Sequence, residues 1–252
     1  MSELEGVLRA AGRLSRIAGL AAVTVLRSGR RPRPADGDPA GPVHLASAAR
    51  RALEIHGVQV EESGSPPRGP ALLVSNHVSY LDPLVLASRA ACVPISKAEL
   101  AAWPVFGAVA RRTGVLFVER SSAGSRLAVM RAAERVLGEG GIVLNFPEGT
   151  TTDGSTVLRF RKGLFEVARA AAIPVVPAAI RYSPRELAWT GQTSFVPHYL
   201  RLARLERCRV EVAFGDPIRS QAHGTAEQLA HAARASTLSL LRSRTACLRK
   251  AR

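Results

Sequence analysis

Cysteine is scarce in the sequence: Cys92, Cys208 and Cys247 are the only three among 252 residues. They lie far apart and form neither a C-x-x-C pair nor a disulfide framework, which is typical of proteins from a reducing compartment. The Cys and His spacings also lack any zinc-binding pattern. We therefore expect no metal site in this protein.

Long apolar runs are lacking as well. The longest unbroken run of apolar or small residues extends from Ile17 to Leu26. As a helix this run would span about 15 Å, roughly half of a bilayer's hydrocarbon core, which excludes a simple transmembrane protein. No repeat is present, and a hydrophobic content of 46% excludes a disordered chain. The length suits one α/β domain with a sizeable core.

Lysine accounts for only three of the 35 basic residues, so 32 of the cations are arginines, against 20 acidic residues. The net charge of +15 and the isoelectric point near 11.3 predict an anionic partner: nucleic acid, an anionic membrane surface or an acidic substrate. Aromatic residues make up only 5% and no nucleic-acid motif is present, so we expect no nucleic acid partner. A non-catalytic, basic membrane- or nucleic-acid-binding protein remains an alternative at this point.

Residues 1–28 are predicted to form an amphipathic helix, because apolar side chains recur at three- and four-residue spacing. Arg9, Arg13 and Arg16 fall on the opposite side of this helix. Two interpretations stay open: the helix lies in a membrane interface with its apolar side down, or it docks on the protein's own core. The apolar stripe comprises Leu4, Val7, Leu8, Ala11, Leu14, Ala18, Ala21 and Val25.

The rest of the chain alternates short apolar strands with helices, which predicts an α/β fold with a mostly parallel sheet flanked by helices. A Pro- and Gly-rich linker, Arg30 to Pro42, precedes it, so we divide the chain into residues 1–42, the helical extension and linker, and residues 43–252, the main domain. Strands are expected over 71–75, 115–118, 142–146, 175–181 and 210–214, and helices over 44–56, 83–89, 125–138, 163–172 and 226–241.

Polar residues follow the strand at 71–75, where ligands bind in α/β sheets. Histidine is the side chain whose ordinary pKa suits a general base on a hydroxyl, and a carboxylate on its other ring nitrogen would orient it. The turn between His77 and Asp82 is short enough to bring that carboxylate back to the ring. Alternatively, Asp82 caps the helix that begins at Pro83, and Asn76 and Ser79 only stabilise the turn.

Three further segments complete a pattern. The ordered set is His77-x4-Asp82, Gly114-x2-Phe117-x2-Arg120, Phe146-Pro-Glu-Gly149 and Ile173-Pro-Val-Val-Pro177. It resembles the four motifs of the glycerolipid acyltransferase family, whose best-known members are the 1-acylglycerol-3-phosphate acyltransferases. The resemblance covers about Leu72 to Arg181 and implies the fold of that family.

The resemblance implies that His77 is the catalytic base and Asp82 its orienting partner. Arg120 would hold the anionic head of the acceptor, and Lys97 would hold phosphate or polarise the thioester carbonyl. Arg161 and Lys162 belong to a further family-like segment but are equally compatible with solvated loop charges. The implied substrate-binding set is Asn76, Ser79, Lys97, Gly114, Phe117, Arg120, Phe146, Pro147, Glu148, Gly149, Thr150, Val176 and Pro177. Within it, Glu148 to Thr150 would shape the acceptor site and Val176 with Pro177 the acyl channel.

The implied reaction is O-acylation of a lysolipid hydroxyl by acyl-CoA or acyl carrier protein, without cofactor or covalent intermediate. The absence of a Gly-x-Ser-x-Gly elbow agrees with this. Backbone N–H groups after His77, or Lys97, are candidate donors to the oxyanion. We place 1-acyl-sn-glycerol-3-phosphate first as the acceptor. Trp189-x-Gly191-x3-Phe195-x2-His198 resembles a branch associated with lyso-ornithine lipid, which is the alternative. We expect peripheral attachment to the cytoplasmic side of the cell membrane.

Overall fold

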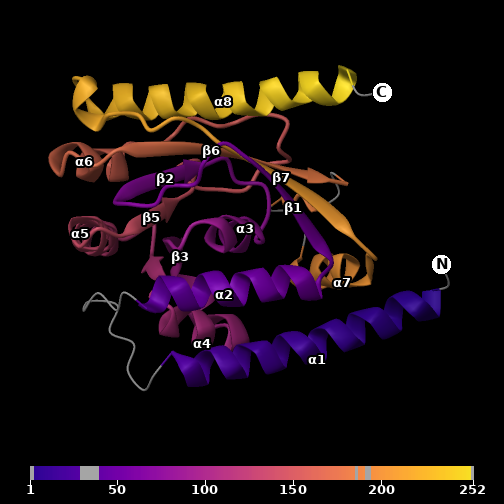
Figure 1. Ribbon diagram of the computed structural model, residues 1–252. Coiled ribbons are helices and arrows are strands. Elements are labelled where there is room, and N and C mark those ends of the chain that lie inside the picture. The colour runs from indigo at the N-terminus through magenta and orange to yellow at the C-terminus, as the bar shows by residue number, and fades with distance from the viewer. Residues whose placement is uncertain (1–2, 29–39, 185–186, 191–193, 251–252) are drawn as a thin grey trace.

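The computed structural model describes residues 3–28, 40–184, 187–190 and 194–250. Within them, seven strands form a sheet with the order β1-β7-β6-β2-β5-β3-β4 (Figure 1). The strands are β1 (Val58–Ser63), β2 (Ala71–Ser75), β3 (Val93–Lys97), β4 (Leu116–Val118), β5 (Ile142–Asn145), β6 (Val175–Ser183) and β7 (Cys208–Phe214).

Strands β2 to β6 run parallel to one another, so their carboxyl ends meet at the same edge of the sheet. Strand β7 pairs antiparallel with β6, and β1 pairs parallel with β7. The predicted mostly parallel sheet flanked by helices is therefore confirmed. Strand β2 lies at the centre, between β5 and β6, and its five residues are all buried.

The burial of β2 explains why its sequence is apolar without interruption. Ala71 and Leu73 point into the core on one face of the sheet, whereas Leu72 and Val74 point into the core on the other. A strand covered on both faces has no polar side, since successive side chains alternate between the faces. The site that follows β2 therefore begins at the most rigid part of the molecule.

Helices cover both faces of the sheet (Figure 1). The core on one face includes side chains of α2, α3, α4 and α7, and that on the other includes side chains of α5, α6 and α8. Helix α1 lies outside the first group and contacts α2, α4 and α7. The helices are α1 (Glu3–Arg27), α2 (Ala40–Ile55), α3 (Asp82–Arg89), α4 (Pro104–Arg112), α5 (Ala123–Gly138), α6 (Gly163–Ala170), α7 (Phe195–Arg204) and α8 (Ala226–Lys250).

Among the described residues, two strands and two α-helices were not predicted from the sequence, β1, β3, α4 and α7, and neither were the short helices η1 (Ala98–Ala102) and η3 (Ser220–Ala222). Strand β1 is an edge strand with exposed glutamates, β3 contains Pro94, and α7 contains Pro197, so each pattern is weak or carries a residue typical of turns. Helix α2 begins at Ala40, within the predicted linker, whose residues 30–39 lie outside the described residues. The division at residue 42 stays a prediction.

Helix α1 docks on the protein through the face opposite its apolar stripe. Gly6, Ala10, Arg13 and Thr24 are buried at helical spacing. By contrast, Leu4 and Leu8 of the stripe are 67% and 63% exposed. Arg13, which the sequence places on the side opposite the apolar stripe, is therefore part of the docked face. Its guanidinium donates to the carbonyl oxygens of Ala203, Leu205 and Glu206, at the end of α7. No described helix is both long enough and apolar enough to span a bilayer.

Candidate active site

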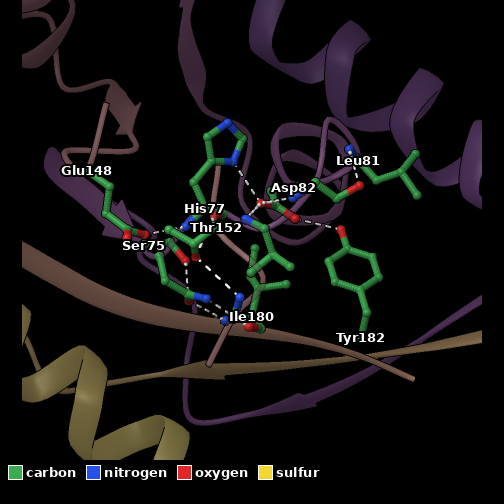
Figure 2. A network of polar contacts seen from close by, with 12 residues as sticks. Ser75, His77, Leu81, Asp82, Glu148, Thr152, Ile180 and Tyr182 are labelled. Carbon is green, nitrogen blue, oxygen red and sulfur yellow. Dashed lines mark hydrogen bonds and ion pairs between the residues drawn. The ribbon is translucent and has the colours of Figure 1, made fainter. Parts of the chain in front are cut away.

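The turn after β2 brings His77 and Asp82 together. His77 Nδ1 lies 2.8 Å from Asp82 Oδ2, so the contact that the short spacing predicts is present (Figure 2). The imidazole keeps 17% of its side-chain surface exposed, and its second nitrogen points away from this network. The ring stacks on Phe146, with the ring centroids 4.2 Å apart. The imidazole is thus oriented and accessible, as a general base requires.

Asp82 is completely buried, and four donors surround its carboxylate. Besides the imidazole, the N–H groups of Val78 and Ser79 donate to Oδ2 at 2.6 and 2.9 Å. The hydroxyl of Tyr182 donates to Oδ1 at 2.6 Å. This carboxylate faces back into the turn and makes no capping bond with α3, which corrects the capping alternative. Such a carboxylate holds the imidazole in one tautomer and stabilises the imidazolium when a proton is taken up.

Asn76 and Ser79 are fully buried and stabilise the turn, which differs from the substrate-binding role predicted for them. The Asn76 amide donates to Ile180 O at 3.0 Å and accepts from Ile180 N at 2.8 Å, joining the turn to β6. The Ser79 hydroxyl accepts from the Leu81 N–H at 3.4 Å. The alternative considered for both residues, that they only stabilise the turn, describes them better.

Glu148 lies beneath the same turn. Its two carboxylate oxygens accept the N–H groups of His77 and Leu158, both at 2.7 Å. Burial raises the pKa of Glu148, while these two backbone donors act in the opposite direction. Glu148 is only 3% exposed and positions the His77 backbone, while its predicted part in shaping the acceptor site stays a prediction. Phe146 and Pro147 are also buried, so they support the ring and the loop.

Two guanidinium groups meet at Gly149, after β5. Arg120 donates to the carbonyl oxygen of Gly149. A side chain at Gly149 would come within 2.9 Å of the Arg161 guanidinium, and the positive φ of 75° also favours glycine there. Burial and the neighbouring Arg161 lower the pKa of Arg120. Two guanidinium groups near one backbone segment form a suitable anion site, so Arg161 joins the predicted Arg120.

The other predicted site residues divide between the two edges of the sheet. Lys97 ends β3 and is exposed at the same edge as His77, while Thr150 is exposed beside Gly149. Gly114 precedes β4 and therefore lies towards the opposite edge, where its φ of 80° makes it a turn residue. Its predicted contact with substrate stays a prediction. Phe117, within β4, packs against the core.

Val176 and Pro177 lie inside β6, opposite Leu73 and Val74 of β2. Both are buried in the sheet, so they pack the core at the point where an acyl channel was expected. The structure gives them no opening, and their contact with an acyl chain stays a prediction.

The three N–H groups of residues 77–79 all have partners, which removes them as donors to an oxyanion. His77 N donates to Glu148, and Val78 N and Ser79 N donate to Asp82. Of the candidates named from the sequence, Lys97 and the Tyr80 N–H stay predictions.

Sequence reasoning missed Tyr182 and Thr152. Tyr182 reaches Asp82 from β6, 100 positions along the chain. The Thr152 N–H donates to His77 O at 2.9 Å. Neither residue belongs to a motif or a spacing pattern. Only the pairing of β6 with β2 brings Tyr182 to the turn.

Comparison with known proteins agrees with this geometry. Residues 57–181 match the acyltransferase family. A lyso-ornithine lipid O-acyltransferase of Pseudomonas aeruginosa is 39% identical over 187 residues, which cover 72% of each chain. The chain belongs to the acyltransferase family. The human 1-acyl-sn-glycerol-3-phosphate acyltransferase alpha is 38% identical to this acyltransferase over 131 residues, covering 49% of this chain and 46% of the relative.

The fold of this acyltransferase is also that of a solved family member. The 1-acyl-sn-glycerophosphate acyltransferase PlsC of Thermotoga maritima superposes with a TM-score of 0.70 over 98% of both chains, at 19% sequence identity. At that identity the likeness concerns the fold alone. The predicted family and enzyme class are confirmed, and the alternative of a non-catalytic basic protein is not supported.

Proposed function

We propose that this acyltransferase transfers a fatty acyl group to the free hydroxyl of a lyso-ornithine lipid. His77 takes the proton from the hydroxyl, whose oxygen attacks the thioester carbonyl of the donor. The C–S bond then breaks, and the thiolate of the carrier receives the proton from the imidazolium. Asp82, bonded to the other ring nitrogen at 2.8 Å, stabilises the imidazolium between these two transfers.

One observation favours this acceptor over the others. Trp189, Phe195 and His198, the residues associated with the lyso-ornithine branch, lie around Tyr80 of the catalytic turn. The ring centroid of Tyr80 is 5.7, 5.0 and 5.5 Å from theirs, respectively. Gly191, the remaining residue of that motif, lies outside the described residues. The segment that suggests this branch therefore contacts the turn that carries His77.

The extent of the matches favours the same acceptor. The lyso-ornithine lipid O-acyltransferase of Pseudomonas aeruginosa matches over 72% of this chain, whereas the human 1-acyl-sn-glycerol-3-phosphate acyltransferase alpha matches over 49%. We therefore reverse the order of acceptors that the four motifs alone suggested.

The second candidate acceptor is 1-acyl-sn-glycerol-3-phosphate, which the anion site favours. Arg120 and Arg161 suit a phosphate monoester as well as a carboxylate, because both anions accept two hydrogen bonds from a guanidinium. A single assay separates the candidates. The purified enzyme is offered equal amounts of both lysolipids with one acyl donor, and the two products are quantified by mass spectrometry.

We expect a kcat/KM at least tenfold higher for lyso-ornithine lipid, and a preference for the phosphate acceptor would overturn the proposal. The variant His77→Gln should lose at least about a hundredfold in kcat, in line with general base catalysis. Retention of transfer by a folded His77→Gln variant would exclude the mechanism. Parallel assays with acyl-CoA and acyl carrier protein would identify the donor, for which no further cofactor is proposed.

We also propose that α1 holds the enzyme on the membrane surface as a peripheral protein, on the cytoplasmic side. The exposed stripe of α1 includes Leu4, Leu8 and Leu14, while the opposite face is anchored to α7. Beside α1, a cavity of about 830 Å³ is lined by Arg201, Arg204 and Arg207, among others. Apolar side chains next to arginines suit the interface, where acyl chains and anionic head groups adjoin.

A further inference from the structure

Both tryptophans of the chain lie in one cluster of aromatic rings, formed by Tyr80, Trp103, Trp189 and Phe195. Trp103 and Phe195 have ring centroids 4.5 Å apart, and Tyr80 and Phe195 are 5.0 Å apart. Aromatic residues make up only 5% of the sequence, so their concentration at one place requires a reason.

This aromatic cluster lies at the catalytic edge of the sheet. Tyr80 belongs to the turn after β2, Trp103 follows β3 and Trp189 follows β6, and the carboxyl ends of these strands share one edge. The backbone N–H of Trp189 also donates to the backbone carbonyl oxygen of Val78 at 2.8 Å, directly beside His77 in the chain. The loops that form the cluster thus surround the same site as the catalytic base.

The rings pack edge to face around Phe195, whose ring also stacks on that of Tyr199. Tyr80, Trp103 and Trp189 are inclined to Phe195 by 69°, 61° and 84°. All four residues are only partly buried, which differs from the fully buried phenylalanine Phe165 of the core. Aromatic side chains that stay partly exposed can accept a cation over a ring face, which attracts it through the quadrupole.

The charges around the site are suited to a zwitterion. Arg120 and Arg161 supply positive charge at Gly149, while Glu99 acts on Arg120 with the opposite sign. Glu99 lies on η1 (Ala98–Ala102), the short helix immediately before Trp103. A head group with a carboxylate and an ammonium would meet the two guanidinium groups at one end and the aromatic rings at the other.

We propose that the aromatic cluster of Tyr80, Trp103, Trp189 and Phe195 binds the terminal ammonium of an amino-acid head group, while Arg120 and Arg161 bind its carboxylate. This inference rests on the proposed function and specifies how its acceptor is recognised. An ornithine linked through its α-amino group retains a carboxylate and a terminal amine, which are the two groups required. The phosphate acceptor has no ammonium and would leave the aromatic cluster unused.

The test makes two comparisons. One removes the ammonium charge from the lipid, and the other removes an aromatic ring from the protein. Lyso-ornithine lipid is compared with the same lipid acetylated on its terminal amine, and kcat/KM is measured for each. We expect the wild-type enzyme to prefer the free amine by about tenfold, mainly through KM, since cation–π contacts have effects of this size. Trp103→Leu should reduce this ratio to near one, and Trp103→Phe should retain most of it.

Binding is measured independently of turnover. Because both tryptophans lie in the aromatic cluster, tryptophan emission reports directly on its occupancy. In a His77→Gln background, titration with the free-amine lipid should change the emission with a Kd about tenfold below that of the acetylated lipid. Trp189→Leu provides a second variant if Trp103→Leu does not fold.

Each negative result has a separate meaning. If wild-type enzyme acylates both forms of the lipid equally, the aromatic cluster does not bind the ammonium and the proposed function stands. If Trp103→Leu and Trp189→Leu lower both activities equally, the rings serve packing only and the inference is overturned. If lyso-ornithine lipid is not acylated at all, the proposed function fails and this inference fails with it.

Discussion

At the scale of single residues, the site is organised around the buried carboxylate of Asp82. Asp82 has four donors, of which only His77 was anticipated as its partner. A buried carboxylate with so many donors holds its position firmly, because each lost bond would leave buried charge unpaired. The imidazole of His77, the proposed base, is therefore held in one orientation by a fully buried carboxylate.

Tyr182→Phe tests this arrangement by removing one hydroxyl from the interior. Because Oδ1 of Asp82 loses its donor, we expect unfolding to become easier by about 1.5 to 3 kcal/mol, the usual range for hydrogen bonds to charged groups. We also expect kcat to fall about tenfold with little change in KM, since Tyr182 acts through Asp82 on the base. Steady-state kinetics and urea titration measure the two effects.

Tyr199→Phe is the matched control for that variant. The Tyr199 hydroxyl lies 3.2 Å from His56 Nε2 and does not contact Asp82. The control should keep the wild-type kcat. Equal kcat values for Tyr182→Phe and the wild type would show that the Tyr182 hydroxyl has no positioning role.

At the scale of elements, α1 and α7 are joined by arginine side chains. Arg13 donates to Ala203 O at 3.2 Å and to Glu206 O at 3.0 Å, and Arg9 donates to Arg204 O at 2.9 Å. These carbonyl groups lie at the carboxyl end of α7, where helices leave acceptors without internal partners and favour cations. The same helix carries Phe195 and His198 to the catalytic turn.

Arg13→Met should lower the free energy of unfolding by about 2 to 3 kcal/mol, because a buried, charged donor is removed from several carbonyl groups. Arg16→Met is the control, since Arg16 is exposed on the same helix and should change stability by less than about 0.5 kcal/mol. Chemical denaturation followed by circular dichroism compares the two. Equal stabilities would mean that the Arg13 bonds add nothing to the docking of α1.

His56, at the end of α2, makes stability depend on pH. Burial, and to a lesser degree the nearby Arg13, lowers the pKa of His56 to about 4. The unfolded chain therefore binds a proton near pH 6.5 that the folded protein does not bind until about pH 4. Stability from this group is complete above pH 6.5 and falls by up to about 3 kcal/mol as the pH drops to 4.

The variant His56→Gln removes this contribution. Denaturation at pH 7 and at pH 4.5 should show a smaller loss of stability for the variant than for the wild type. The same pH dependence in both proteins would mean that His56 titrates normally in the folded state.

At the scale of the whole molecule, the acyltransferase has one apolar surface on α1 and a surplus of positive charge, +15 in total. Helix α1, which carries the exposed leucines, lies on the outside of the helical layer that covers one face of the sheet (Figure 1). Such a surface suits an enzyme whose acceptor resides in a membrane.

The double variant Leu8→Asp, Leu14→Asp should weaken binding to anionic vesicles at least tenfold while leaving the thermal stability nearly unchanged. The reason is that both side chains are exposed and lose only their transfer into the interface. Leu127→Asp is the control, because Leu127 is 49% exposed on α5. Vesicle sedimentation measures the binding, and unchanged sedimentation of the double variant would contradict a membrane role for α1.

The amino-acid sequence by itself was sufficient for the strands β2, β5 and β6, for the pairing of His77 with Asp82 and for the family. These features depend on near neighbours: an apolar run predicts a buried strand, and a five-residue spacing limits how far a carboxylate can lie from a ring. The spacing of the apolar stripe likewise predicted the amphipathic α1.

Only the tertiary structure decided what surrounds these features. Tyr182 and Ile180 reach the turn because β6 pairs with β2, and Arg161 reaches Gly149 through the fold of the loop after β5. The face of α1 that docks is the one that carries Arg13, since α7 offers carbonyl groups there. The periodicity of a sequence shows how polar and apolar positions are spaced along the chain. The partners of a polar group depend instead on which distant strands and helices the fold makes adjacent.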